Sequence, residues 1–293
     1  MLMKISAVCC GRNDNYGGHL NERATYAFNA MLKSFDEVIY VDWNTESGKN
    51  ILTDDLVLEN RDKLKTIAVT PEMVNDIIGD EPAQKMCEVM ARNVGIRRAT
   101  GDIIVNTNVD VICPPKEQLS ILAQKVRPDE MIVLSRMNIQ LEHLQKAFGD
   151  NVANVQEHMP LVFGIEPLGV GQKIMAPTLT MTKDVISQFP EEVHHRLASV
   201  VTSCGDFQVA HRDLLMKIRG FEESQKKRNF SDTTIQYKVI MVGGMVTGTN
   251  FPPIYHIDHE RDEKESSFNS RHSMSPHTTN DENWGCWLKI EHD

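Results

Sequence analysis

One continuous stretch, residues 88–114, restricts the fold of this chain more than any other, and it reads EVMARNVGIRRATGDIIVNTNVDVICP. Apolar residues recur at helical spacing in its first part, which predicts a helix. Gly101 is expected to end that helix, because glycine readily adopts the left-handed backbone conformation of helix ends. Residues 103–105 then form a short apolar run, typical of a parallel strand that is buried on both faces. A helix followed at once by a buried strand predicts an α/β sheet.

Asn108 and Asp110 follow this strand, at the edge of an open α/β sheet where ligands bind. Side chains two residues apart on an extended chain point the same way, so both are expected to face the site, with Asp110 at an exposed strand end. Their oxygens suit a hard divalent cation, Mn²⁺ or Mg²⁺, which in turn holds a diphosphate. The alternative is that the two residues only shape a turn, as Asn and Asp often do.

The same stretch matches the pattern of a known family. Its sequence A-R-N-x-G-I-x-x-A-x-G-D-x-I-x-x-x-N-x-D resembles the core of the GT-A glycosyltransferases, particularly family 2 and its relatives. In that family the strand carries a DxD motif for metal and nucleotide, whereas Asn108 replaces the first acid here. The neutral amide lowers the negative charge of the site, so the need for a metal stays open.

The resemblance implies a GT-A fold, which is a mixed, mostly parallel sheet with helices on both faces. It also implies a single domain over residues 1–293. Residues 1–115 would form the half that binds the nucleotide sugar, and residues 116–262 the half that binds the acceptor. Residues 263–293 are polar and poor in aliphatic side chains, so we expect a flexible lid or tail there.

Charge and cysteine usage exclude other classes of protein. The 293-residue chain has a net charge of −10 and no marked cluster of Lys and Arg, so a nucleic-acid partner is not expected. Its six cysteines show no CxxC or zinc-finger spacing, which predicts buried thiols in a reducing compartment. The N-terminal apolar run is too short for a signal peptide or a membrane span. We therefore expect a cytoplasmic protein without a transmembrane segment.

Residues 5–10 form an apolar run read as the first strand, and Gly11, Arg12 and Asn13 follow it. A glycine-containing polar break at this point is where nucleotide-binding folds place backbone that contacts the ligand. The GT-A resemblance assigns Arg12 and Asn13 to the base and ribose of the donor. The alternative is a solvated loop.

The second strand is expected at residues 38–41, and it ends at Asp42. A carboxylate at such a strand end suits hydrogen bonding to a ribose or a base. Asp42 and Thr45 fit the V-D-x-x-S/T motif of the GT-A enzymes. Arg92, on the helix of the first stretch, is a candidate contact for the diphosphate or base of the donor, with a surface arginine as the alternative.

The second half contains GFEE at residues 220–223 and FSDTTIQYK at 230–238. These segments resemble the part of the family that carries the catalytic base of inverting enzymes, and Asp232 occupies the place of that base. A sugar hydroxyl needs a carboxylate that accepts its proton during attack on the anomeric carbon. The alternative is a helix cap formed by Ser231 or Asp232.

His256 and His259 lie three residues apart and are expected on one face of a helical turn. Imidazole suits Mn²⁺ and similar borderline cations. The string H-E-R-D that begins at His259 resembles H-S-R-D of galactosyltransferase relatives, in which a late histidine completes the metal site. Two surface histidines are the alternative.

Apolar patterning predicts the remaining elements. Helices are expected at residues 21–35, 71–78, 117–124, 140–148, 183–189 and 214–218, and further strands at 67–69, 131–134, 174–181, 239–242 and 246–250. Residues 151–172 lack periodicity and form either a functional loop or an insertion.

These features predict a glycosyltransferase that moves a hexosyl or pentosyl group from a UDP- or GDP-sugar to a hydroxyl of a glycan or glycoconjugate, with inversion and with a divalent metal. Two alternatives remain. One is a non-catalytic nucleotide-sugar- or carbohydrate-binding relative, favoured by Asn108 and by Ser231 in place of an acid. The other is a sugar nucleotidyltransferase, which would require a lysine in the loop after the first strand.

Overall fold

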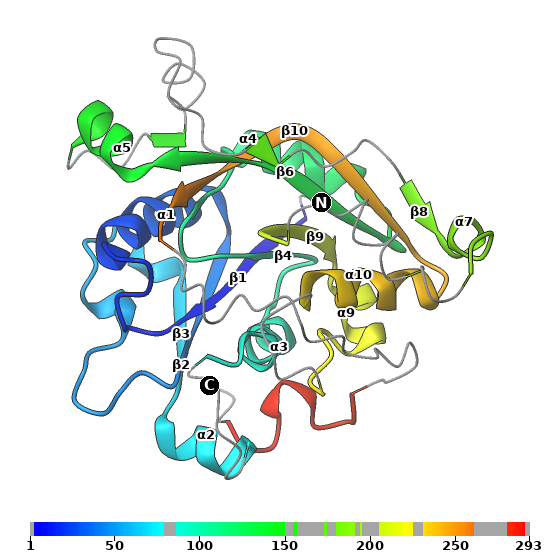
Figure 1. The fold of residues 1–293 in the computed structure, drawn as a ribbon, viewed down its shortest axis with the longest axis horizontal. Coiled ribbons are helices and arrows are strands. Elements are labelled where there is room, and N and C mark those ends of the chain that lie inside the picture. Colours follow the sequence, from blue (N-terminus) through cyan, green and yellow to red (C-terminus); the bar gives the residue numbers. More distant parts are fainter. Residues whose placement is uncertain are drawn as a thin grey trace.

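The computed structural model describes residues 3–78, 86–149, 155–156, 173–174, 180–190, 194, 205–224, 231–260 and 280–290. The described strands form one sheet in the order β3-β2-β1-β4-β9-β6-β10-β5, with β7 on β6 and β8 on β10 (Figure 1). Their bounds are β1 Ile5–Gly11, β2 Glu37–Trp43, β3 Leu64–Val69, β4 Ile103–Thr107, β5 Val111–Ile112, β6 Glu130–Gln140, β7 Lys173–Ile174, β8 Thr180–Thr182, β9 Phe207–His211 and β10 Met245–Asp258.

The sheet is mixed and mostly parallel along this order, as expected. Four pairings are parallel (β3–β2, β2–β1, β1–β4 and β6–β10), and three are antiparallel (β4–β9, β9–β6 and β10–β5). The carboxyl ends of β1, β2 and β4 therefore meet at one edge. Because β9 runs the other way, its first residue Phe207 pairs with Thr107 at that same edge.

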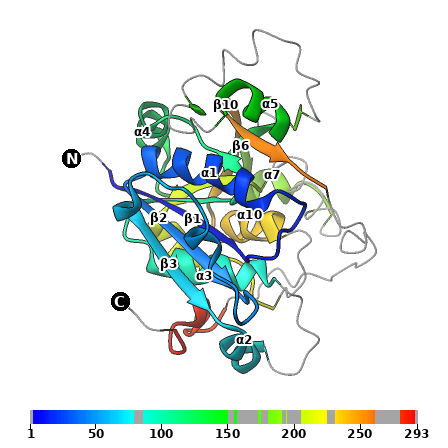
Figure 2. The same ribbon diagram turned by 90° about the vertical axis from the view of Figure 1, so that its left-hand side faces the viewer.

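Helices cover both faces of the sheet (Figures 1 and 2). One core cluster joins α1 and α4 to the sheet, and a second joins α3, α9 and α10 to the opposite face. The helices are α1 Leu20–Ser34, α2 Pro71–Ile78, α3 Glu88–Arg98, α4 Lys116–Lys125, α5 Leu141–Phe148, α7 Lys183–Ile186, α9 Arg212–Ile218 and α10 Ser231–Met241, with short 3₁₀ turns η1 Leu52–Asp54, η2 Arg61–Lys63 and η4 Trp284–Cys286.

The apolar run of strand β1 is continuous because both faces of the strand are buried. Ala7 and Cys9 belong to the cluster under α1, while Val8 and Cys10 belong to the cluster under α3. A strand buried on both faces needs apolar side chains at every position rather than at alternate ones. The sequence prediction of a doubly covered sheet is confirmed.

Two glycines let α3 and the following turn lie close to β1. A Cβ at Gly95 would lie 2.5 Å from Val8 Cγ1, and one at Gly101 would lie 2.5 Å from Ser6 Oγ. The expectation that Gly101 ends the helix in a left-handed conformation is wrong, because α3 ends at Arg98 with an extended Ala99. Gly101 is needed for close approach instead.

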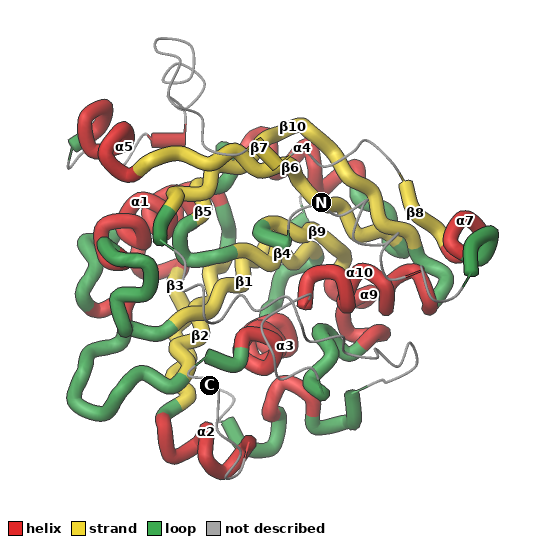
Figure 3. The backbone as a smooth tube through the Cα atoms, viewed as in Figure 1, coloured by secondary structure: helices red, strands yellow, loops and turns green. Residues whose placement is uncertain are grey.

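The structure corrects other local predictions (Figure 3). Residues 239–242 do not form a strand: 239–241 are the last residues of α10, since short apolar runs fit a buried helix as well. Residues 174–181 divide between β7 and β8, with 175–179 outside the described residues. His256 lies in strand β10, and His259 lies just beyond its end, rather than on a helical turn.

The last described segment packs against α3. The backbone N–H of Gly285 donates to Glu223 Oε1 at 2.7 Å, and Trp284 is buried in the cluster under α3. Of the lid or tail predicted at residues 263–293, only residues 280–290 are described, and most of 151–172 lies outside the described residues as well. None of the described helices is long and apolar enough to cross a membrane. The cytoplasmic location stays a prediction.

Candidate functional site

The carboxyl ends of β1 and β2 are joined by a hydrogen-bonded chain that ends on Asp42. The Thr45 hydroxyl donates to Asp42 Oδ1 at 2.9 Å and accepts from the backbone N–H of Asn13 at 2.9 Å. The Tyr40 hydroxyl donates to the same carboxylate oxygen at 3.0 Å. Burial raises the pKa of Asp42 despite these donors. The structure thus brings the expected V-D-x-x-T residues together with the loop after β1.

The side chains of Arg12 and Asn13 contact neighbouring loops. Arg12 Nε lies 3.1 Å from Asp14 Oδ2. Asn13 Nδ2 donates to Asp55 Oδ2 at 2.8 Å and to the carbonyl oxygen of Asn50 at 3.0 Å. These bonds fix the shape of the loop beside Asp42, and the donor-binding role of both residues stays a prediction.

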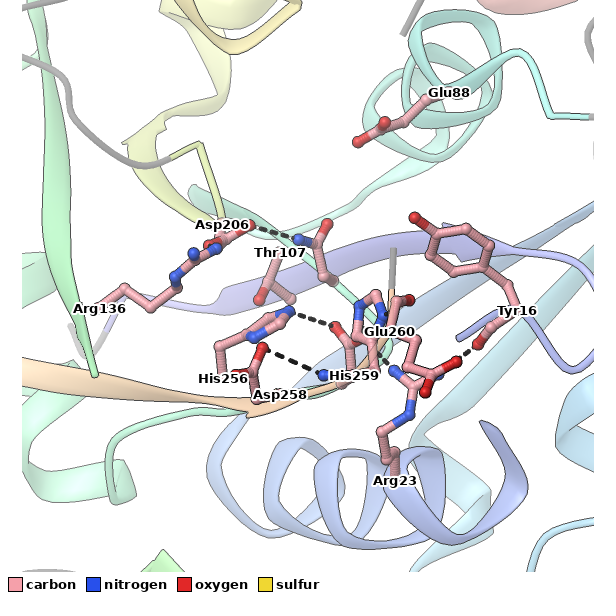
Figure 4. Close-up of polar contacts among 12 residues, drawn as sticks. Tyr16, Arg23, Glu88, Thr107, Arg136, Asp206, His256, Asp258, His259 and Glu260 are labelled. Atoms are coloured by element: carbon pink, nitrogen blue, oxygen red, sulfur yellow. Dashed lines mark hydrogen bonds and ion pairs between the residues drawn. The ribbon is translucent and has the colours of Figure 1, made fainter. Parts of the chain in front are cut away.

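Asp110, His256 and His259 come together at this edge (Figure 4). His256 Nε2 lies 3.6 Å from Asp110 Oδ1, and His259 Nε2 lies 3.4 Å from Asp110 Oδ2. One ligand atom of each residue lies within 4.8 Å of the others. Asp110 precedes the two histidines by 146 and 149 positions in the sequence. The pairing of β5 with β10, in which Val111 pairs with His256, brings them together. The sequence prediction that they share one site is consistent with this geometry.

The His259 side chain is closely packed against Tyr16 and Gly17. Its Nδ1 lies 2.8 Å from the carbonyl oxygen of Glu260, and its ring meets the ring of Tyr16 edge-on at 5.2 Å. A Cβ at Gly17 would lie 2.3 Å from His259 Nδ1, so only glycine permits this packing. Burial lowers the pKa of His259, which favours the neutral ring that can ligate a cation.

Sequence reasoning missed Arg23 of helix α1. Its Nη1 donates to Asp110 Oδ2 at 2.6 Å, and its side chain is only 1% exposed. Its Nε also donates to the carbonyl oxygen of Gly18 at 3.1 Å. The expectation that Asp110 lies at an exposed strand end is therefore wrong, because Asp110 is 6% exposed and paired with a buried guanidinium. No motif around Arg23 signalled this contact.

Asn108 does not face the same way as Asp110. The extended chain ends at Thr107, so the two lie around a turn, and the two-residue alternation no longer applies. Asn108 Nδ2 donates to Asp206 Oδ1 at 2.6 Å, and its Oδ1 accepts from Arg92 Nη2. The expectation of a shared direction is wrong, because a turn separates the two residues.

Asn108 belongs to a chain of polar contacts that crosses the site, and Figure 4 labels Glu88, Asp206 and Arg136 of that chain. Arg92 binds Glu88 and Asn108, Asn108 binds Asp206, and Asp206 binds Arg136. Arg92 is 3% exposed, so the surface alternative for it is wrong. Glu88 and Arg136 were not identified from the sequence. Glu88 pairs with Arg92 four residues later on α3, and Arg136 meets Asp206 of a distant segment.

Asp232 lies at the start of α10, near this chain of contacts. Its Oδ1 accepts from the backbone N–H of Thr233 at 2.9 Å. A Cβ at Gly205 would lie 2.2 Å from the Cβ of Asp232, so this glycine lets the segment before β9 approach α10. Burial raises the pKa of Asp232, and the negative charges of Asp206 and Glu88 raise it further. A carboxylate with a raised pKa is a better proton acceptor near neutral pH.

The comparisons with known proteins concern the fold. No family model matches the sequence, and no curated protein does. Similar solved structures include TarS residues 1–349 of S. aureus (16% identity, 87% of this chain, 60% of that chain, TM-score 0.49). Another is the Pyrobaculum calidifontis mannosyltransferase PcManGT with GDP-Man and Mn²⁺ (17% identity, 89% of this chain, 59% of that chain, TM-score 0.46). A third is GalNAc-T7 with UDP, GalNAc and Mn²⁺ (11% identity, 88% of this chain, 44% of that chain, TM-score 0.53).

This chain therefore spans 60%, 59% and 44% of the lengths of those three chains. The similarity to GalNAc-T7 and the mixed sheet with helices on both faces establish the GT-A glycosyltransferase fold, as the sequence predicted.

The buried ion pair yields a stability prediction. Asp110→Ala leaves the Arg23 guanidinium buried without its carboxylate, so we expect a loss of about 3–5 kcal/mol in the free energy of unfolding. Urea denaturation in EDTA measures it, with Asp129→Ala as the control, since the Asp129 side chain is 47% exposed and its pair with Arg127 is worth less than about 1 kcal/mol. Arg23→Leu added to Asp110→Ala should restore much of the loss. A loss below about 1 kcal/mol for Asp110→Ala would show that this ion pair does not hold the fold.

Proposed function

We propose that this chain is a glycosyltransferase that moves a sugar from a UDP- or GDP-sugar to an acceptor hydroxyl, with inversion and with a divalent cation. The observation that carries the proposal is the grouping of Asp110, His256 and His259 at the sheet edge that also holds Asp42 and Asp232. Metal ligands, a carboxylate suited to a nucleoside and a carboxylate base are the three parts that this reaction needs. GalNAc-T7, which shares the fold, is described with UDP and Mn²⁺, which supports the same ligand class here.

The residues fit a cation such as Mn²⁺ or Mg²⁺. One carboxylate and two imidazoles offer ligand atoms within 4.8 Å of one another, and mixed N and O ligands suit Mn²⁺ better than Mg²⁺. His256 Nδ1 is buried and lacks a hydrogen-bond partner among the described residues, while His256 Nε2 lies 3.6 Å from Asp110 Oδ1. When bound, the cation supplies positive charge that stabilises the diphosphate leaving group.

Arg23 gives this site a second source of positive charge. Its guanidinium already occupies Asp110 Oδ2, so a cation must share that carboxylate with it. Asn108, bound to Arg92 and Asp206, contributes to the metal ligands only if those bonds break. The Asp110 carboxylate and the two histidines, without Asn108, are therefore the ligand set that we propose.

Asp232 is the proposed base. As the acceptor oxygen bonds to the anomeric carbon, the bond from that carbon to the diphosphate oxygen breaks, and the electron pair leaves with the diphosphate. The Asp232 carboxylate takes the hydroxyl proton. The raised pKa of Asp232 suits this transfer, and the chain from Glu88 to Arg136 holds the neighbouring charges in place.

A second candidate function is binding of nucleotide sugars without transfer. The observation that favours it is the Arg23–Asp110 ion pair, which neutralises the one carboxylate of the metal group. Release of free sugar or of transferred product from UDP- and GDP-sugars, followed over hours with Mn²⁺, separates the two functions. Only the enzyme turns over.

Nucleotide binding is the first functional prediction. UDP or GDP should raise the melting temperature, and Mn²⁺ should increase the shift, because a ligand that binds only the folded state stabilises it by about 2.7 kcal/mol at 100 times its Kd. His259→Gln should remove the part of the shift that depends on Mn²⁺. The matched control is His19→Gln, whose side chain is 72% exposed. No shift with any nucleoside diphosphate contradicts the glycosyltransferase proposal.

The base role of Asp232 predicts a rate effect. Asp232→Asn should lower transfer by roughly 10²–10⁴-fold and leave donor affinity nearly unchanged, since only the proton acceptor is lost. The exposed Asp184→Asn on α7 is the control. If Asp232 only caps α10, the Asn variant keeps normal turnover, and Asp232→Ala loses about 0.5–2 kcal/mol of stability without a comparable loss of rate.

The charge of Glu88 predicts a shift in pH dependence. Transfer needs the ionised Asp232 carboxylate, so activity is lost as the pH falls through its raised pKa. Glu88 raises that pKa, and Arg92, which lowers it, is paired with Glu88. Glu88→Gln should therefore move the acidic limb of the kcat/KM profile to lower pH. The control is Glu117→Gln on α4, because the Glu117 side chain is exposed. A limb that stays in place or moves upward would contradict this electrostatic link.

A further inference from the structure

A cavity of about 550 Å³ lies at the edge of the sheet opposite the candidate site. Its lining residues come from the turn that precedes β4, the carboxyl end of α3, the amino end of α9 and the start of β3. Asp102 comes just before β4 and Asn108 just after it, so the length of that strand, roughly 17 Å, separates the cavity from the site. The cavity therefore belongs to neither the donor residues nor the metal group.

Positive charge dominates the lining of this cavity. Lys65, Arg97, Arg98 and Arg212 line it, against the two carboxylates of Asp102 and Asp213. Asp102 Oδ2 already accepts from the backbone N–H of Lys4 at 2.8 Å. Four cations in one concave place are notable in a chain whose net charge is −10, because most of its surface repels anions.

Two of the arginines are held by stacking and by backbone carbonyls. The guanidinium carbons of Arg97 and Arg98 lie 4.5 and 5.3 Å from the ring centre of Trp287. Arg97 donates to the carbonyl oxygen of Glu282 at 2.8 Å, and Arg98 to those of Gly285 and Ile290 at 2.9 and 3.0 Å. These carbonyl oxygens fix the positions of both guanidinium groups. Burial lowers the pKa of both arginines, so a bound anion would offset their loss of hydration.

The guanidinium group of Arg212 also lines this cavity. Its Nε donates to the carbonyl oxygen of Ala99 at 3.0 Å, which anchors the side chain. Its two terminal nitrogens have no hydrogen-bond partner among the residues that the structure describes. Guanidinium groups bind phosphate oxygens through paired N–H donors, and several fixed together suit a ligand with more than one phosphate.

We propose that this cavity is a binding site for a small, soluble anion that carries two or more phosphate groups. A cavity of this size holds a ligand of nucleotide dimensions. Helix α3 spans the distance between the two sites, with Glu88 and Arg92 at the candidate site and Arg97 and Arg98 at the cavity. The proposal does not depend on the glycosyltransferase function.

The test measures binding of sodium tripolyphosphate to the full chain by calorimetry, in EDTA and at constant ionic strength. Arg212→Gln should weaken binding about tenfold or more, because it removes one charged contact. Asp213→Asn should tighten binding, because it removes a repelling carboxylate from the lining. Lys183→Gln on exposed α7 removes one positive charge elsewhere and should change nothing.

Failure of this proposal is separable from failure of the proposed function. Asp232→Asn should bind tripolyphosphate as tightly as the unaltered chain, whatever its transfer rate. Absence of binding, or equal weakening by Arg212→Gln and Lys183→Gln, would overturn the site. Sedimentation with phosphatidic acid vesicles that Arg212→Gln abolishes, without binding of tripolyphosphate, would assign the cavity to lipid headgroups and overturn the soluble ligand.

Discussion

The buried pair between Arg23 and Asp110 is the interaction on which the candidate site depends. It joins helix α1 to the turn between β4 and β5, and the Asp110 carbonyl oxygen accepts from the backbone N–H of Ile257 at 2.9 Å. The same residue thereby fixes the end of β10, where His256 and His259 lie. A buried charge pair is costly to break, so the three elements keep one arrangement. Asp110, His256 and His259 lie together because this carboxylate is held at the meeting point of those elements.

A second connection unites the two halves of the chain. Asn108, at the end of β4, donates to Asp206 at the start of β9, and Asp206 binds Arg136 of β6. The antiparallel pairing of β9 with β4 makes this contact inevitable, since it places the first residue of β9 beside the last residue of β4. The neutral amide of Asn108 allows this contact, because it can donate a hydrogen bond to the Asp206 carboxylate. An aspartate at this position would meet the Asp206 carboxylate and repel it.

Much of this arrangement followed from local patterning. The strands that end at Gly11, Trp43 and Thr107 were visible as apolar runs followed by polar groups, and parallel strands bring such ends together. The contacts of Arg23, Asp206 and Arg136 were not visible, because each residue acts on a partner 70 to 98 positions away in the sequence. No short pattern encodes such a contact. The strand wrongly expected at residues 239–242 reflects the same limit, since burial on a helix and burial in a sheet select the same apolar side chains.

The sequence alone determined the α/β class, the strand ends that carry polar groups and the identity of the titratable residues, because periodicity and turn chemistry are local properties. Only the tertiary structure decided which of those residues meet. It turned Asn108 away from Asp110 and toward Asp206, and it paired Asp110 with Arg23. It also assembled a basic cavity from α3, α9 and β3 at the opposite edge. The direction of each side chain and its distance from the others depend on strand order and on where each turn leaves the sheet. The spacing of residues along the chain specifies neither.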